Sequence, residues 1–348
     1  MSEAFYQEGI PEKGAGEPER NAARKVFPGN LGTVRRNFSR LGWGVFTILI
    51  SAVLAQALVM ALAELWWPGW MESKWGMWIL SYVPLYLVSV PLGLVVFRKT
   101  PAVKLPVSGI ASGKLGVITC ICFCMMYAGN LVGIVLTGIL QLIPGVTASN
   151  PVESMTVGTA FLPRFLVMVI GAPFVEEYIF RKQLIDRMHL YGQKTAVVVS
   201  AVMFGLFHGN LSQFFYAFAL GLVFGYVYIS SGKLRYSIGL HMLINFMGGV
   251  VAPMLLEKLP LTVDGMLDLV NIGDGALWLA FYMLYALALI GLSIAGLILL
   301  CVKRREFTFH TASLELPRSL RFRTVWCNVG MILAVLGCMV MVGLSLFS

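Results

Sequence analysis

Long apolar stretches separated by short polar segments run through the chain from about residue 43 to its end. A helix that crosses the hydrocarbon core of a bilayer needs roughly 20 mostly apolar residues. The pattern therefore predicts an all-α fold, a polytopic membrane helix bundle of about nine transmembrane helices. The predicted spans lie at about 43–65, 76–97, 115–142, 159–180, 195–209, 214–230, 237–254, 277–302 and 325–347.

The polar segments divide the chain into four regions. Residues 1–42 are polar, carry both signs of charge and contain three prolines, which predicts a disordered, basic cytoplasmic tail. The remaining regions are N-terminal transmembrane helices at 43–150, a helical core at 151–255 and C-terminal transmembrane helices at 256–348. We find no internal repeat of the kind that many transporters contain.

Composition places the protein in the bilayer and argues against a nucleic-acid partner. Apolar residues make up 58% of the chain and charged residues 12%, whereas soluble domains are close to half apolar and a quarter charged. The net charge of +9 comes from basic residues that lie in the tail and in short loops between apolar stretches, which is the distribution of a membrane protein. The six cysteines fall inside or at the ends of apolar stretches, so we expect no disulfide framework.

The basic residues also predict an orientation. If the predicted loops are assigned alternately to the two sides, 23 of the 26 Lys and Arg residues fall on one side. Basic loops favour the cytoplasmic side. We therefore expect a multi-pass protein of the cell membrane with its N-terminus in the cytoplasm and its C-terminus outside.

Few ionisable side chains interrupt the apolar stretches, and those that do are concentrated in the central core. Glu176, Glu177, His208 and His241 lie in apolar surroundings, where a charge is costly unless it faces the protein interior or water. Glu177 and Arg181 are one helical turn apart, which predicts an ion pair. Glu176 is then left as a free carboxylate that can act as a general base.

Two further pairs are spaced by one helical turn. His208 follows Phe204 by four residues and His241 precedes Asn245 by four, so each pair shares a helix face. These polar groups can converge on one interior cavity. The alternatives are a purely structural Glu177–Arg181 ion pair, an interfacial His208, and a packing hydrogen bond from His241 to Asn245.

The remaining two histidines have a different setting. His189 and His310 lie in basic loop segments, where we expect both to be solvated.

Taken together, three motifs in order resemble the CPBP family of intramembrane proteases. This family comprises the type II CAAX prenyl endopeptidases and bacteriocin-processing and immunity proteins, and is also called Abi. The resemblance covers about residues 155–255. The motifs that carry it are Glu176-Glu177-xxx-Arg181, Phe204-xxx-His208 and His241-xxx-Asn245.

The resemblance implies an endopeptidase that cuts membrane-anchored peptides or proteins. It implies that Glu176 is the general base, that His208 helps it to activate water, and that His241 and Asn245 donate to the developing oxyanion. Such donors stabilise a tetrahedral intermediate by several kcal/mol in a water-poor site. Glu177, Arg181 and Phe204 are then supporting residues, which take no part in the reaction itself.

Zinc is the alternative to this metal-free chemistry. Glu176, His208 and His241 include ligand types that suit zinc, with water as the fourth ligand. The chain has no HExxH sequence, in which one helix supplies two ligands and a base. We therefore expect a glutamate-type protease without a cofactor, and keep a zinc enzyme as the second possibility.

Two functions of other classes compete with the protease. One is a non-catalytic bacteriocin-immunity or membrane scaffold protein of the same fold. The other is a proton-coupled transporter in which the carboxylate and the histidines form a relay. Four buried polar groups argue against the first, and the missing repeats argue against the second.

Overall fold

The computed structural model describes residues 27–70, 73, 75–148, 161–262, 267 and 272–347. The described residues contain no β-strand, and their only β-bridge joins Leu261 and Leu267. The fold is all-α, as predicted. Residues 149–160, 263–266 and 268–271, which lie mostly between predicted spans, are outside the described ranges.

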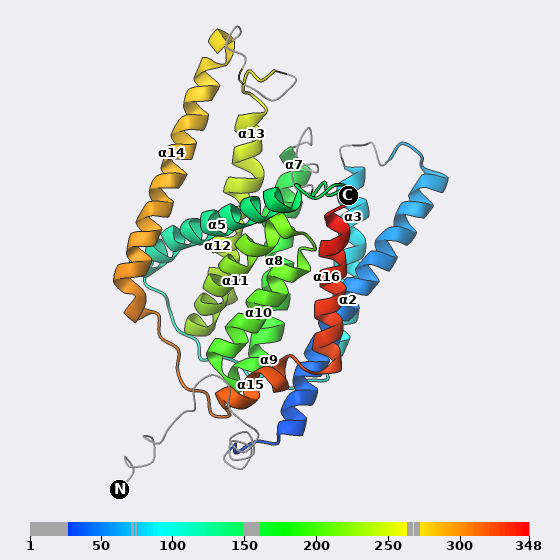
Figure 1. Cartoon of the computed structure of the whole chain (residues 1–348), viewed down its shortest axis with the longest axis vertical. Coiled ribbons are helices and arrows are strands. Elements are labelled where there is room, and N and C mark those ends of the chain that lie inside the picture. Colours follow the sequence, from blue (N-terminus) through cyan, green and yellow to red (C-terminus); the bar gives the residue numbers. More distant parts are fainter. Residues whose placement is uncertain are drawn as a thin grey trace.

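Helices of very different lengths build the bundle (Figure 1). Several helices continue directly into π-helical or 3-10 segments, which carry the label η. The elements are α2 (Leu31–Trp66), α3 (Gly76–Pro84), η1 (Leu85–Ser89), α4 (Val90–Phe97), α5 (Ser112–Leu140), α7 (Phe161–Arg164), η2 (Phe165–Gly171), α8 (Ala172–Glu177), η3 (Tyr178–Ile185), α9 (Asp186–Met188), η4 (His189–Tyr191), α10 (Gln193–Phe207), α11 (Leu211–Ser231), α12 (Leu234–Phe246), η5 (Met247–Val251), α13 (Ala252–Leu256), α14 (Ile272–Lys303), η6 (Arg304–Glu306), α15 (Arg318–Val325) and α16 (Val329–Ser345).

The predicted count of about nine spans is not confirmed. Among the described residues, six helices are long and apolar enough to cross a membrane, or seven if α15 and α16, bent by 66°, count as one span. Helices do form at the two remaining predicted spans. However, α10 has 15 residues and is about 22 Å long, which is short of a bilayer core of about 30 Å. The run from Phe161 to Ile185 carries several buried charges.

The N-terminal boundary also differs from the prediction. Residues 31–42, expected to belong to a disordered tail, form the first three turns of α2. Asn30 caps this helix, because its side chain accepts a hydrogen bond from the Thr33 N–H at 3.1 Å. The rest of the expected tail, residues 1–26, lies outside the described ranges.

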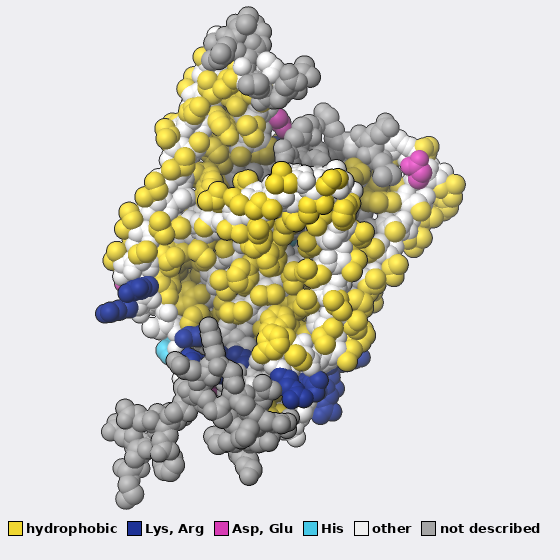
Figure 2. All heavy atoms as spheres, viewed as in Figure 1, with side chains coloured by type: hydrophobic (Ala, Val, Ile, Leu, Met, Phe, Trp, Pro, Cys, Tyr) yellow, Lys and Arg dark blue, Asp and Glu magenta, His cyan; other side chains and the backbone are white. Residues whose placement is uncertain are grey.

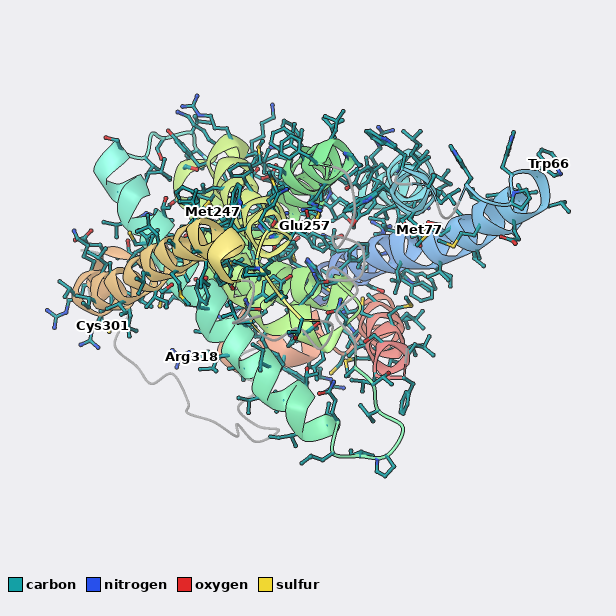
Figure 3. The ribbon with its side chains drawn as sticks, turned by 90° about the horizontal axis from the view of Figure 1, so that it is seen from above. Trp66, Met77, Met247, Glu257, Cys301 and Arg318 are labelled. Atoms are coloured by element: carbon teal, nitrogen blue, oxygen red, sulfur yellow. The ribbon has the colours of Figure 1, made fainter. Side chains whose placement is uncertain are left out.

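The helices of the central core pack against one another and are flanked by longer helices. α10 packs along α11, α5 packs on both α11 and α14, and α16 packs on α2. Seen from above, Trp66 of α2 and Cys301 of α14 lie at opposite edges of the molecule (Figure 3). α5 runs obliquely across the bundle in both views (Figures 1 and 3). The charged residues of the central core are therefore surrounded by apolar helices.

The surface has the layout of a protein in a bilayer. Figure 2 shows a broad band of hydrophobic side chains over the visible face, with Lys and Arg gathered at its lower end. Many large apolar residues of the helices are exposed, such as Leu54, Leu87, Ile134 and Leu284. Because lipid tails cover apolar side chains without cost, this band matches the hydrocarbon layer.

Close backbone contact joins α16 to α2. A Cβ atom at Gly330 would overlap the carbonyl oxygen of Ser39, and one at Gly42 would overlap the backbone of Gly330. Small residues allow membrane helices to approach in this way and to gain van der Waals contact. Gly330 is therefore required for the packing of the last helix against the first.

We predict that Gly330→Val separates α16 from α2 and lowers stability by about 1–3 kcal/mol, because the added side chain has no space. The measurement is the thermal unfolding midpoint in detergent. Gly343→Val is the matched control on the same helix, since no atom lies within 4 Å of a Cβ at Gly343. Equal midpoints for the two variants would contradict the prediction.

Candidate active site

The backbone around the two adjacent acids is an irregular helix. α8, which ends in Glu176 and Glu177, lies between the π-helical segments η2 and η3. Pro173 stands near the start of α8 and has no N–H to give the carbonyl group four residues earlier. π-Helical turns are frequent at functional sites, where they change the direction in which side chains point.

Glu177 forms a fully buried ion pair with Arg181. Arg181 Nε lies 3.1 Å from Glu177 Oε2, and both side chains are 0% exposed. Arg181 Nη1 donates to Ser200 Oγ at 3.2 Å, and the guanidinium group lies over the rings of Phe204 and Phe224 at 4.5 and 5.6 Å. The i,i+4 spacing correctly predicted this pair, and Arg181 neutralises only one of the two acids.

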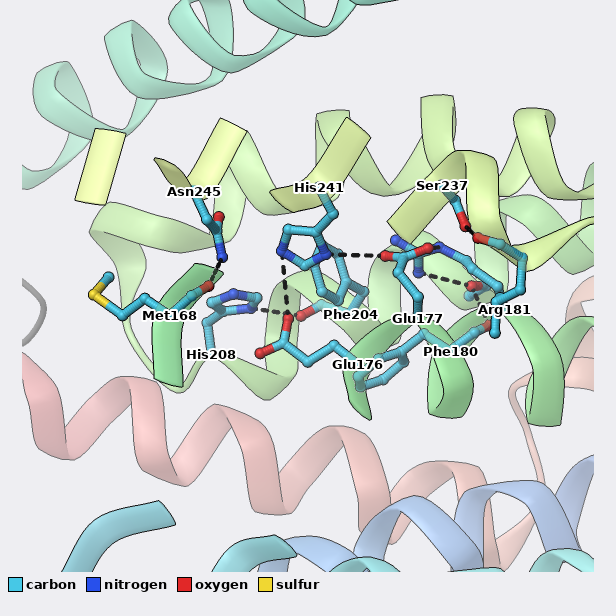
Figure 4. Close-up of polar contacts among 12 residues, drawn as sticks. Met168, Glu176, Glu177, Phe180, Arg181, Phe204, His208, Ser237, His241 and Asn245 are labelled. Atoms are coloured by element: carbon cyan, nitrogen blue, oxygen red, sulfur yellow. Dashed lines mark hydrogen bonds and ion pairs between the residues drawn. The ribbon is translucent and has the colours of Figure 1, made fainter. Parts of the chain in front are cut away.

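His241 of α12 lies between the two carboxylates (Figure 4). Its Nδ1 is 3.1 Å from Glu177 Oε1 and its Nε2 is 3.8 Å from Glu176 Oε2. Nδ1 faces a carboxylate, which only accepts, so Nδ1 carries a hydrogen and donates it. The ring also stacks on Phe224, with centroids 5.3 Å apart and planes inclined by 27°. Three contacts thus set the orientation of this imidazole.

Glu176 differs from its neighbour in accessibility. Its side chain is 25% exposed, whereas that of Glu177 is 0% exposed. Among the described residues, its carboxylate forms an ion-pair contact with His241, and no arginine nitrogen lies within 4 Å of it. Of the two adjacent acids, Glu176 is the one that a reactant can reach.

His208 ends α10 and is held by the carbonyl group of its own helix. Its Nδ1 lies 2.8 Å from the Phe204 carbonyl oxygen, one of the last carbonyls of the helix. Nδ1 therefore donates, and a neutral ring presents Nε2 as an acceptor. The Phe204 ring meets both His208 and His241 edge-on, with centroids 4.9 and 5.7 Å away. Phe204 is thus the spacer between the two histidines.

Asn245 lies one turn after His241 on α12. Its Nδ2 donates to the Met168 carbonyl oxygen of η2 at 2.8 Å. An amide nitrogen has two hydrogens, so the second remains for another acceptor. The packing alternative for His241 is not what the structure contains, because the His241 ring contacts the two acids and Asn245 bonds to Met168.

The three sequence motifs therefore meet, although they come from different helices. α8 and η3 carry the two acids and Arg181, α10 carries Phe204 and His208, and α12 carries His241 and Asn245. Figure 4 shows their polar ends directed toward one another.

Sequence reasoning missed three participants. Ser200, Phe224 and the Met168 carbonyl each hold a residue of the motifs. Ser200 is a polar residue in an apolar stretch, which is a usable signal. Phe224 is an ordinary aromatic residue of an apolar helix, and a backbone carbonyl leaves no trace in a sequence.

The other histidines differ in outcome. His310 is exposed, as expected. His189 is not solvated: it is 7% exposed, and its Nε2 bonds to the Val103 carbonyl oxygen at 2.9 Å. The loop before α5 covers His189. The basic composition of the segment that contains His189 gave no sign of this burial.

The side chains of the alternative zinc site do not form a ligand set. Within the described part of the chain, no three His, Cys, Asp or Glu side chains are grouped so that they could hold a metal ion. His241 faces Glu176 and Glu177, and His208 is turned to its own helix through Nδ1. These side chains are therefore assigned no metal-binding role in the proposed reaction.

Comparison with known proteins gives two matches. Residues 158–247 match the family model described as type II CAAX prenyl endopeptidase Rce1-like. The chain is also 32% identical over 124 residues to the membrane-embedded CAAX protease MroQ of Staphylococcus aureus (strain USA300). That alignment covers 33% of this chain and 49% of MroQ, so the chain matches about half the length of this relative. No solved structure matches the chain significantly.

The matched residues include every member of the cluster, from Met168 to Asn245. Residues 158–247 are therefore similar to the type II CAAX prenyl endopeptidase Rce1-like family.

Proposed function

We propose that this protein is an intramembrane endopeptidase that hydrolyses peptide bonds with water activated by Glu176. The observation that carries the proposal is the division between the two adjacent acids. Glu177 is fully buried and bound by Arg181 and His241, while Glu176 is partly exposed beside His241. A protein that needed only a structural ion pair has no use for a second, accessible carboxylate at membrane depth.

In the proposed reaction Glu176 takes a proton from a water molecule. The water oxygen forms a bond to the carbonyl carbon of the substrate, and the carbonyl oxygen becomes an oxyanion. His208 Nε2 accepts a hydrogen bond from the other O–H of the same water and so orients it. When the C–N bond breaks, the proton held by Glu176 passes to the leaving nitrogen.

The oxyanion needs donors, and two groups of α12 can supply them. Asn245 has one N–H beyond the one that it gives to Met168. His241 gives Nδ1–H to Glu177, so a donor at Nε2 requires the protonated ring. Donors fixed in advance are worth several kcal/mol to the transition state because they need no reorganisation.

The proposed substrates are membrane-anchored peptides or proteins. The apolar band of the surface supports a position of the cluster within a bilayer, where such substrates are concentrated. The relative MroQ is described as a membrane-embedded CAAX protease, which agrees with this class.

We also propose that the basic end of the molecule faces the cytoplasm. The described Lys and Arg residues gather where α2 and α5 begin and α14 ends. The start of α2 and the end of α16 lie at opposite ends of the bundle (Figure 1), which agrees with an N-terminus inside and a C-terminus outside.

We predict that Glu176→Gln abolishes cleavage, with a loss of at least about 10³-fold, because an amide cannot accept the proton. The measurement compares newly formed peptide termini in the membranes of cells that express wild-type protein or the variant at equal levels. Glu64→Gln at the exposed end of α2 is the matched control and retains wild-type cleavage. Identical peptide profiles for all three proteins would favour the non-catalytic binding protein.

We predict that Arg181→Ala lowers stability by about 3–5 kcal/mol, because it leaves Glu177 as an unpaired buried charge. The unfolding midpoint in detergent measures this effect. The double variant Glu177→Gln, Arg181→Met removes both charges and regains most of the lost stability. A single variant as stable as the wild type would show that the ion pair is not a structural requirement.

Reporter fusions to the full chain test the predicted orientation, with the N-terminus in the cytoplasm and the C-terminus outside. Green fluorescent protein at the N-terminus fluoresces because it stays in the cytoplasm, and alkaline phosphatase at the C-terminus is active because it lies outside. An inactive C-terminal phosphatase, with the fusion protein stably inserted, contradicts the proposed orientation.

A further inference from the structure

A cavity of about 420 Å³ lies beside the candidate active site. It is formed by α2, the start of η1, the end of α10 and α16. Its walls are mostly apolar, and Leu49, Leu85, Met341 and Leu344 contribute to them. Its volume is within the range of about 300–1,000 Å³ that is usual for ligand pockets in proteins.

The cavity and the active site share His208. This residue lines the cavity, and its Nδ1 is held by the Phe204 carbonyl oxygen of the cluster. In Figure 4 the ribbons of α16 and α2 run along the side of the cluster that bears Glu176 and His208. α10, which carries His208, also packs on α16. A ligand in the cavity therefore lies next to the place where the proposed water is activated.

One polar group in the wall indicates the chemistry of the ligand. Gln56 Nε2 donates to the Ser81 carbonyl oxygen at 2.6 Å. Among the described residues no donor is bonded to Gln56 Oε1, and Gln56 is one of the residues that line the cavity. A backbone N–H complements such an acceptor, whereas an acyl chain has no hydrogen to donate. A peptide fits these walls better than a lipid tail.

We propose that this cavity binds the polypeptide segment of the substrate next to the scissile bond, with an apolar side chain against Leu85, Met341 and Leu344. The proposal rests on the proposed protease function. A backbone N–H of the segment donates to Gln56 Oε1. Since exposed apolar residues on both α2 and α16 face the bilayer, the segment enters between these two helices.

This assignment gives a role to helices outside the family segment. α2 and α16 lie beyond residues 158–247, which hold the whole reactive cluster. The chemistry then resides in the family segment, and side-chain specificity resides in helices that the family match does not include.

The test uses purified protein in vesicles and a library of quenched fluorescent peptides, each anchored to the vesicle by one acyl chain. Members of the library differ in the volume of the residues on either side of the central bond. We expect Leu344→Trp to raise KM at least tenfold for peptides with a large apolar residue at one flanking position. For peptides with Gly or Ala there, the same variant raises KM by a smaller factor, so the ratio of the two KM changes is the measured result.

Leu336→Trp is the matched control. Leu336 is the same residue type on the same helix, is 55% exposed against 62% for Leu344, and is not part of the cavity wall. We expect it to cleave the library as the wild type does. Equal effects of the two tryptophans would overturn the proposal. So would a KM change that depends on the acyl-chain length of the vesicle lipid and is independent of peptide sequence, because it would assign the cavity to lipid.

The acceptor at Gln56 has its own test. N-methylation of the peptide amide that bonds to Gln56 raises KM about tenfold for the wild type. It has no further effect on Gln56→Leu, because that variant lacks the acceptor. Full sensitivity of Gln56→Leu to N-methylation would refute the assigned hydrogen bond.

A binding measurement separates failure of this proposal from failure of the proposed function. A benzoylphenylalanine replaces Leu344 or Leu336 in the Glu176→Gln protein, and the same peptides are cross-linked by light. Cross-linking at position 344 and not at 336 supports the cavity even if no peptide is cleaved by the wild type. Cleavage that is lost in Glu176→Gln, without cross-linking at 344, supports the protease and rejects the cavity.

Discussion

The Glu177–Arg181 ion pair is the constraint on which the central helices depend. Two charges with no exposure to solvent are costly to remove from water, and their attraction offsets this cost only when further contacts complete them. Those contacts come from three other helices: Ser200 and Phe204 of α10, Phe224 of α11 and His241 of α12. The pair therefore fixes the relative positions of four helical elements.

The same pair creates the difference between two adjacent acids. Glu177 is bound by Arg181 through Oε2 and by His241 through Oε1, so each of its carboxylate oxygens already has a partner. Glu176 points about 100° away on the helix and keeps a partly exposed carboxylate. Neighbouring carboxylates with different environments are a usual way to separate a structural acid from a reactive one.

The flanking helices contribute packing and shape more than chemistry. α2 and α16 meet at glycines that allow their backbones to touch, and further along both helices line the cavity beside His208. A groove between helices exposed to the bilayer suits a substrate that is itself membrane-anchored.

The sequence by itself determined the helical class, the places where helices form and the residues of the cluster, because apolar stretches and intramembrane charges are local signals. The Glu177–Arg181 pair followed as well, since its partners are one turn apart. Only the tertiary structure decided that His241 bonds to Glu177 and Asn245 to Met168, that Phe224 stacks on His241, and that His189 is buried. Each of these contacts joins residues far apart in the chain, and their distance depends on how whole helices tilt and pack. The predicted count of about nine spans is not confirmed: the described residues contain six or seven helices that are long and apolar enough to cross a membrane, and α10, with 15 residues, is not among them.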